Sequence, residues 1–383
     1  MSKSNETTPN VPTLRFKQFQ DNWSSKRLSD IAEVVGGGTP DTTDSTLWNG
    51  GIQWFTPTEV GHSKYVSMSA RTISQLGLQK SSAKILPAGS ILLSSRATVG
   101  ECSIAQKDCT TNQGFQNLIP KKGINNEFLY YLAQTQKRHF IKYASGSTFL
   151  EISNSEIKKT KCAIPSIEEQ TEIATFLSAI DKKIETQNKI ISKYETLIKG
   201  IRERIVNCGW QWKKLDELIQ EGVVRLNRGN IIPKHPKDNT YKYPVYSSST
   251  QNNGLMGYND TYMFDKELIT WSIDGGGNFF YRKKHKFNVT NVCGIMQVDE
   301  NVYSYRFIAE MLIYQHSKMK FDYQSKAHPS VISSLYSLPC LHISEQNFYC
   351  QLFIVLDKKM HIEQCSLNKL KEQKKYLLSK MFI

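Results

Sequence analysis

The sequence has no long apolar segment and no regular arrangement of cysteines. No apolar run approaches the roughly 18 residues that a membrane-spanning helix needs, and the first ten residues are polar, unlike a secretory signal. The eight cysteines lack a CxxC spacing, and the eight histidines are scattered. We therefore expect a cytoplasmic protein with reduced thiols, no metal site and no membrane contact.

Catalytic and cofactor-binding motifs are missing as well. There is no Gly-Lys-Ser/Thr of a nucleotide-binding loop, no Asn-Pro-Pro-aromatic or Asp-Pro-Pro-Tyr of an amino-methyltransferase, and no glycine-rich cofactor loop. Serine, histidine and aspartate stand in no context typical of a catalytic triad. The sequence predicts a chain that is not an enzyme by itself and holds no cofactor, with a nuclease as a minor alternative.

Positive charge is in excess and unevenly distributed. The formal net charge is +14, but residues 166–207 are neutral, with seven Lys and Arg against seven Asp and Glu. Residues 1–165 carry 19 basic against 12 acidic side chains, and residues 208–340 carry 16 against 12. Such a distribution favours contact with a polyanion through these two segments, and nucleic acid is the first candidate.

One pattern occurs twice and organises the chain. A proline leads to Glu-Gln at 169–170 and at 345–346, and Asp-Lys-Lys follows at the same distance, at 181–183 and 357–359. Apolar residues recur at alternating steps of three and four in the first copy, apart from Gln187, and on one face of the second copy, where polar Glu363 and Lys374 break the pattern. Such spacing is typical of helices packed along each other. The repeat predicts two structural units of similar plan. Ordinary amphipathic core helices are the alternative to a coiled coil.

The segment that precedes each of these helices is predicted to be rich in β-strands. Short runs of strand-forming residues alternate with Gly and Pro in both, a helix is expected around 126–142, and Trp23 and Trp210 open the two halves alike. We expect an α+β fold with an internal duplication, in which two mixed α/β domains are separated by two long antiparallel coiled-coil helices. The expected boundaries are a disordered terminus at 1–12, domains at 13–165 and 208–340, and helical spacers at 166–207 and 341–383.

Candidate binding residues lie in turns and in one basic segment. Arg96 and Thr98 follow a strand and are suited to phosphate or a base edge, or to a structural salt bridge. Asn112 and Gln113 have the amides that pair with adenine, or they cap a turn. The second half offers a polar loop at 251–253 (Gln251, Asn252 and Asn253) and a basic hairpin, or solvated turn, that contains Arg282, Lys283, Lys284 and Lys286.

The order of several motifs resembles one family. They are an RF-x-x-F-x-x-x-W opening, GGGTP followed by LWNGGIQW, SSRATVG, TNQGF and the repeated Pro…Glu-Gln…Asp-Lys-Lys helix. Together they resemble the specificity subunit of type I restriction-modification enzymes from about Thr13 to the C-terminus. The second copy departs from the pattern, because its proline lies seven residues before the glutamine rather than five. This departure affects the expected docking surface of the C-terminal helix.

The resemblance implies a non-catalytic DNA-binding subunit. Each recognition domain would read one half of a bipartite double-stranded target, and the helices would dock two methyltransferase subunits. Restriction subunits would join them, and S-adenosylmethionine, ATP and magnesium would bind to the partners. A transcriptional regulator, or another non-catalytic DNA-binding protein, is the alternative. The helix positions that match the docking regions are Glu169, Gln170, Asp181, Lys182, Lys183, Gln346, Asp357 and Lys358.

Overall fold

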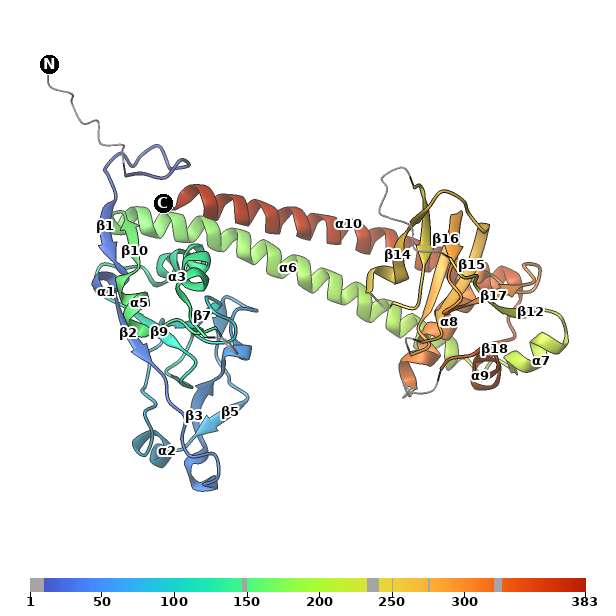
Figure 1. Cartoon of the computed structure of the whole chain (residues 1–383), viewed down its shortest axis with the longest axis horizontal. Helices are drawn as coiled ribbons and strands as arrows, with labels where there is room; N and C mark the ends of the chain where they lie inside the picture. The colour runs from blue at the N-terminus through green and yellow to red at the C-terminus, as the bar shows by residue number, and fades with distance from the viewer. Residues whose placement is uncertain (1–9, 147–149, 233–240, 250, 275, 320–325) are drawn as a thin grey trace, which may run out of the picture. The chain divides into compact units, whose positions relative to one another are not determined.

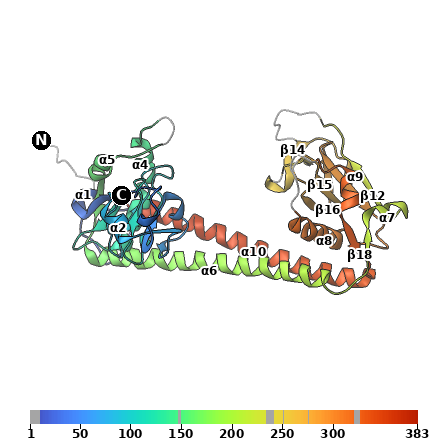
Figure 2. The same cartoon turned by 90° about the horizontal axis from the view of Figure 1, so that it is seen from below.

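The chain folds into two compact units. The computed structural model describes residues 10–146, 150–232, 241–249, 251–274, 276–319 and 326–383. The first unit comprises residues 1–188 and 366–383, and the second comprises residues 189–365. Both combine strands and helices (Figures 1 and 2). No helix in the described part of the chain is both long and apolar enough to cross a membrane.

The first unit contains a five-stranded sheet, a three-stranded sheet and a separate strand pair. The five-stranded sheet has the order β2 (Ala32–Gly36), β9 (Gln116–Pro120), β6 (Ile91–Leu93), β7 (Cys102–Ala105), β4 (Tyr65–Val66). The three-stranded sheet places β3 (Trp48–Phe55) between β5 (Arg71–Ile73) and β8 (Thr110–Thr111). β1 (Ser24–Arg27) pairs antiparallel with β10 (Lys161–Ile164), which brings the beginning and the end of this segment together. The shorter helices are α1 (Leu28–Ile31), α2 (Gln75–Gln79), α3 (Asn126–Thr135), α4 (Lys137–Tyr143) and α5 (Asn154–Lys159), with 3-10 turns η1 (Ser45–Leu47) and η2 (Pro57–Glu59).

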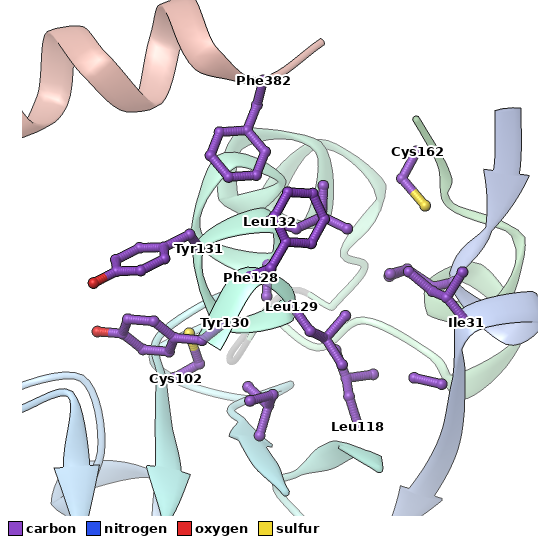
Figure 3. Packing of buried hydrophobic residues seen from close by; sticks show 14 of the residues in the cluster. Ile31, Cys102, Leu118, Phe128, Leu129, Tyr130, Tyr131, Leu132, Cys162 and Phe382 are labelled. Carbon is purple, nitrogen blue, oxygen red and sulfur yellow. The ribbon is translucent and has the colours of Figure 1, made fainter. Parts of the chain in front are cut away.

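The core of the first unit includes both long helices. Residues 128–133 of α3 are all buried. α6 (Ile167–Val206) contributes Ile173 and Leu177 to the same core, and α10 (Ile343–Met381) contributes Leu377. Phe382, just after α10, stacks on Phe128 of α3 with 5.2 Å between ring centroids (Figure 3). Burial of these apolar side chains therefore attaches the long helices to the unit.

The second unit contains one larger sheet. Its strand order is β12 (Val224–Arg228), β17 (Cys293–Val298), β15 (Phe264–Ser272), β16 (Phe279–Val289), β13 (Tyr243–Tyr246), β14 (Leu255–Asn259). β11 (Trp212–Lys214) pairs antiparallel with β18 (Ser337–Pro339), as β1 pairs with β10 in the first unit. Helices α7 (Leu215–Gln220), α8 (Tyr305–Lys318) and α9 (Pro329–Leu335) and the turn segment η3 (Gln251–Gly254), which is not a regular helix, complete it. Trp271 lies fully buried in its core, and a Cβ on Gly294 would lie 1.9 Å from its ring, so only glycine fits opposite it.

The two long helices pack against each other in each unit. In the first unit the beginning of α6 and the end of α10 share one core. In the second unit the end of α6, through Ile198 and Ile205, packs with the beginning of α10, through Phe353 and Leu356. The same two helices therefore contribute to the core of each unit, and the expected mixed α/β fold with its duplicated plan and long helices is confirmed.

Candidate nucleic-acid interface

Four segments of the first unit converge, and we call them the first loop cluster: residues 37–39, 55–57, 95–98 and 111–114. Backbone hydrogen bonds join them, from Gly38 N–H to Thr111 O (2.9 Å), from Asn112 N–H to Phe55 O (3.0 Å) and from Ser95 N–H to Gly114 O (2.9 Å). A Cβ on Gly37 would lie 1.9 Å from Asn112 O, so the approach requires glycine. The cluster brings together the predicted residues of this half: Arg96, Thr98, Asn112 and Gln113.

The side chains of this cluster are partly engaged within the chain. Asn112 Oδ1 accepts a hydrogen bond from Gly114 N–H at 2.9 Å, which is the turn-capping alternative. Thr98 Oγ1 lies 3.0 Å from Ser94 Oγ. Gln113 is exposed and contacts the Thr39 hydroxyl. Base reading by these residues stays a prediction, with Arg96 and Gln113 as its most exposed members.

The second unit repeats this backbone arrangement in a second loop cluster, which we define as residues 229–230, 246–249, 251–254, 273–274 and 290. Asn230 N–H donates to Val289 O at 3.0 Å, and Thr290 N–H donates to Tyr246 O at 2.9 Å, as Gly38 and Asn112 do in the first cluster. A Cβ on Gly229 would lie 2.2 Å from Val289 O, so this close approach requires glycine just as the approach at Gly37 does. Gln251, Asn252 and Asn253 are exposed here. Asn252 and Asn253 adopt left-handed φ values of 48° and 51°, which asparagine tolerates better than most residues.

An ion pair at each cluster is repeated with its charges reversed. Arg96 Nε lies 3.9 Å from Glu151 Oε2 in the first unit, and Lys326 Nζ lies 3.5 Å from Asp274 Oδ1 in the second. The backbone identifies these positions as equivalent. Ile152 N–H donates to Ser95 O, and Ala327 N–H donates to Ile273 O, both at 2.9 Å. Arg96 was predicted from the sequence, whereas Asp274 was not, because nothing in its local sequence marks it as the counterpart of Arg96.

The predicted basic hairpin is the second strand of the β15–β16 pair. Lys283, Lys284 and Lys286 lie within β16 and are exposed, so this segment is not the solvated turn that was the alternative. Arg282 differs from them, because only 4% of its surface is exposed. Burial lowers the pKa of Arg282 to about 10, which still leaves it protonated at neutral pH. Contact of the three lysines with phosphate stays a prediction.

The repeated glutamines fasten each unit to its long helix. Asn125 N–H, at the start of α3, donates to Gln170 Oε1 at 3.0 Å, and Gln170 Nε2 donates to Gly123 O and Pro165 O. In the second unit Ser304 N–H, at the start of α8, donates to Gln346 Oε1 at 3.0 Å, and Gln346 Nε2 donates to Val302 O and Leu341 O. Both side chains are buried, at 1% and 0% exposure, which gives the repeated motif a role inside the chain. Their docking of a partner stays a prediction.

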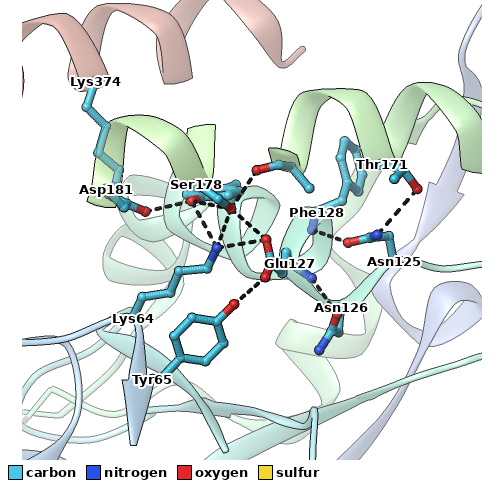
Figure 4. Close-up of polar contacts among 12 residues, drawn as sticks. Lys64, Tyr65, Asn125, Asn126, Glu127, Phe128, Thr171, Ser178, Asp181 and Lys374 are labelled. Carbon is cyan, nitrogen blue, oxygen red and sulfur yellow. Dashed lines mark hydrogen bonds and ion pairs between the residues drawn. The ribbon is translucent and has the colours of Figure 1, made fainter. Parts of the chain in front are cut away.

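The other predicted docking residues divide into engaged and exposed groups. Buried Glu169 pairs with Arg15 at 2.7 Å, and Asp357 pairs with Arg306 at 2.7 Å. Asp181 receives a hydrogen bond from Tyr131 Oη at 2.6 Å and an ion pair from Lys374 at 2.7 Å (Figure 4). The exposed group comprises Lys182, Lys183 and Lys358.

A polar network joins the first unit's sheet to α6 (Figure 4). Lys64 Nζ lies 2.9 Å from Glu127 Oε2 and 2.5 Å from Ser178 Oγ of α6, and Tyr65 also bonds to Glu127. Burial opposes ionisation of Glu127, but hydrogen bonds from Ser178, Tyr65 and Lys64 outweigh it and lower its pKa. Beside this network lies a groove of about 1270 Å³. Its lining includes apolar Ile141, Ile184 and Leu378 and exposed basic Arg138, Lys182, Lys371 and Lys375.

Comparison with known proteins identifies the family. The model of the type I restriction modification DNA specificity domain matches residues 20–196 and 207–335. The chain is 42% identical over 223 residues to the type I restriction enzyme MjaIX specificity subunit of Methanocaldococcus jannaschii. The aligned region covers 52% of each chain. It is 27% identical over 175 residues to the EcoR124I/EcoR124II specificity subunit of Escherichia coli, covering 44% of this chain and 43% of that one. The chain thus matches about half the length of these relatives.

Solved structures share the fold. A type I restriction-modification S subunit from M. genitalium has a TM-score of 0.64 at 17% identity, covering 97% of this chain and 99% of that one. A chain from a study of complex assembly in the type I system has a TM-score of 0.56 at 12% identity, covering 94% and 97%. With both halves matched by the same family model, the chain belongs to the type I restriction-modification DNA specificity domain family.

Proposed function

We propose that this chain is the DNA-reading specificity subunit of a type I restriction-modification complex. Each loop cluster reads one half of a bipartite double-stranded target. One observation carries this proposal: the two clusters share one backbone frame, but equivalent positions carry opposite charges, Arg96 in one and Asp274 in the other. A guanidinium suits the acceptors of guanine, whereas a carboxylate suits the amino group of cytosine. Two clusters of this kind would read different half-sites.

The exposed lysines of β16 would contribute affinity rather than sequence preference. Lys283, Lys284 and Lys286 project from one strand of the second unit, close in sequence and without carboxylate partners among the described residues. Flexible ammonium groups contact phosphate oxygens of any sequence. In this arrangement the loops select the bases and the strand holds the duplex backbone.

The groove in the first unit would receive a helix of a methyltransferase subunit. Its lining combines apolar side chains with more basic than acidic ones (the acidic ones are Asp181 and Glu185), which suits an amphipathic helix with an acidic face, since helices bind in grooves through an apolar stripe. Two such subunits and the restriction subunits would supply catalysis in the cytoplasm, with S-adenosylmethionine, ATP and magnesium bound to them. The chain itself would be non-catalytic.

A domain exchange tests this function. Residues 208–340 are replaced by the equivalent segment of another family member, and the chain is co-expressed with its methyltransferase subunits. Sequencing of methylated DNA should show that one half of the target changes while the other half is kept. Change in both halves or in neither would contradict independent reading. A transcriptional regulator, the competing function, would bind DNA but direct no methylation with any added partner.

A further inference from the structure

Arg282 is a buried cation without an acidic partner. Its side chain is enclosed in the second unit, and no carboxylate in the described ranges lies within ion-pair distance of it. Its guanidinium carbon lies 3.7 Å from the centroid of the Tyr246 ring, and Nε donates to Thr270 Oγ1 at 2.9 Å. Burying a charge is unfavourable unless hydrogen bonds and other contacts compensate it. The contacts of Arg282 must therefore compensate for the burial of its charge.

Arg282 contacts the polar loop that contains Gln251, Asn252 and Asn253. Nη1 donates to Asn253 O at 2.8 Å, and a Cβ on Gly254 would lie 3.3 Å from Nη2. Tyr246 and Gly254 stand at the two ends of this loop, which Ser247 N–H closes by donating to Gly254 O at 2.8 Å. Nη2 itself is buried and has no hydrogen-bond partner among the described residues. The buried guanidinium thus binds the backbone of the loop.

We propose that Arg282 is a positioning residue for sequence recognition by the second loop cluster. It fixes the backbone of the loop that presents Gln251, Asn252 and Asn253, and it does not contact DNA itself. This inference rests on the proposed function and deepens it. It distinguishes Arg282 from the neighbouring lysines, whose exposed ammonium groups can reach phosphate.

Thr270→Val is the decisive variant. Thr270 is completely buried, so it cannot touch DNA, and valine keeps its shape while removing the oxygen that accepts from Arg282 Nε. Arg282→Met removes the charge and all its hydrogen bonds. Thr110→Val is the matched control, because Thr110 is an equally buried strand threonine of the first unit, bonded to Gln53 O.

The experiment uses the full chain with its methyltransferase subunits on a library of target variants, together with DNA binding by the chain at several salt concentrations. We expect Thr270→Val and Arg282→Met to reduce discrimination at bases of the second half-site by roughly 5- to 100-fold, the range for loss of one base contact. Discrimination in the first half-site and the salt dependence should not change. Thr110→Val should leave the second half-site unaffected.

Two outcomes would overturn the proposal. If Arg282→Met weakens binding to all sequences alike and lowers the salt slope by about 0.9, Arg282 is a phosphate contact. If Thr270→Val leaves second-half discrimination at the wild-type level, the loop does not depend on Arg282. Thr270→Val keeps the test decisive should Arg282→Met not fold. Failure of the proposed function has a different signature, because the wild-type chain itself would then direct no sequence-specific methylation.

Discussion

Replacing Gln346 by alanine should loosen the attachment of α8 to α10. The Gln346 amide is completely buried and bonds to three backbone groups of different segments: Ser304 N–H, Val302 O and Leu341 O. Alanine removes all three bonds while keeping helix propensity. The same change at Gln170 removes the corresponding bonds to Asn125, Gly123 and Pro165 in the first unit.

The expected loss is large for a single side chain. Each buried backbone group left without a partner costs about 1–3 kcal/mol, and here one donor and two acceptors lose theirs. The truncated side chain also leaves a cavity. Because such terms are not additive, we expect Gln346→Ala to lower the free energy of local opening by about 3–5 kcal/mol.

Hydrogen exchange followed by mass spectrometry measures this effect segment by segment. A loss of 3 kcal/mol corresponds to roughly a 100-fold increase in the exchange of amides that open with the junction. Gln346→Ala should accelerate exchange at the start of α8 and not in α3, and Gln170→Ala should do the reverse. Gln351→Ala and Gln373→Ala are matched controls, because both glutamines are exposed on α10. If the buried and exposed variants exchange alike, the glutamines do not fasten the units to the helices.

Three further predictions concern the surface. Replacing Lys283, Lys284 and Lys286 together by alanine should weaken binding to all DNA sequences alike and lower the salt slope by up to about 0.9 per lysine, measured by titration at several salt concentrations. Reversing the first ion pair with Arg96→Asp and Glu151→Lys should alter only the first half-site, as read by methylation sequencing; change in the second half-site would contradict separate clusters. Lys371→Glu with Lys375→Glu should weaken co-purification of the methyltransferase subunit, whereas the exposed control pair Lys84→Glu and Lys107→Glu, with the same charge change, should not.

The long helices and the duplication could be predicted because their signals are periodic and local. Apolar spacing extends through α6 with one polar position, Gln187, and Glu-Gln recurs at the same place in α10. The role of the glutamines could not be predicted, since the partners of Gln170 lie at residues 123, 125 and 165 and only the fold brings them together. The sequence suggested a docking role for these glutamines, which stays a prediction, and did not reveal the internal contacts that they make.

The separation of Arg282 from its basic neighbours was also hidden from the sequence. In a regular strand Arg282, Lys284 and Lys286 would share one face. The pairing of β15 with β16 shifts by one residue between Lys266 and Leu268, and such a bulge changes which side chains face the core. Arg282 is consequently buried, and both Lys283 and Lys284 are exposed. Composition identifies a basic segment, but it does not reveal the bulge that places Arg282 in the core and the lysines on the surface.

The division between repeated and different features has a physical logic. The features that recur are those that the backbone requires: Gly37 and Gly229 at close approaches, and Gln170 and Gln346 at helix starts. Substituting any of them would disturb a buried contact and so the fold. The features that differ lie on the surface of the loops, where side chains change at little cost to stability. A chain built in this way could alter one proposed reading surface without disturbing the frame beneath it, and the reversed pairs Arg96–Glu151 and Asp274–Lys326 would be such an alteration.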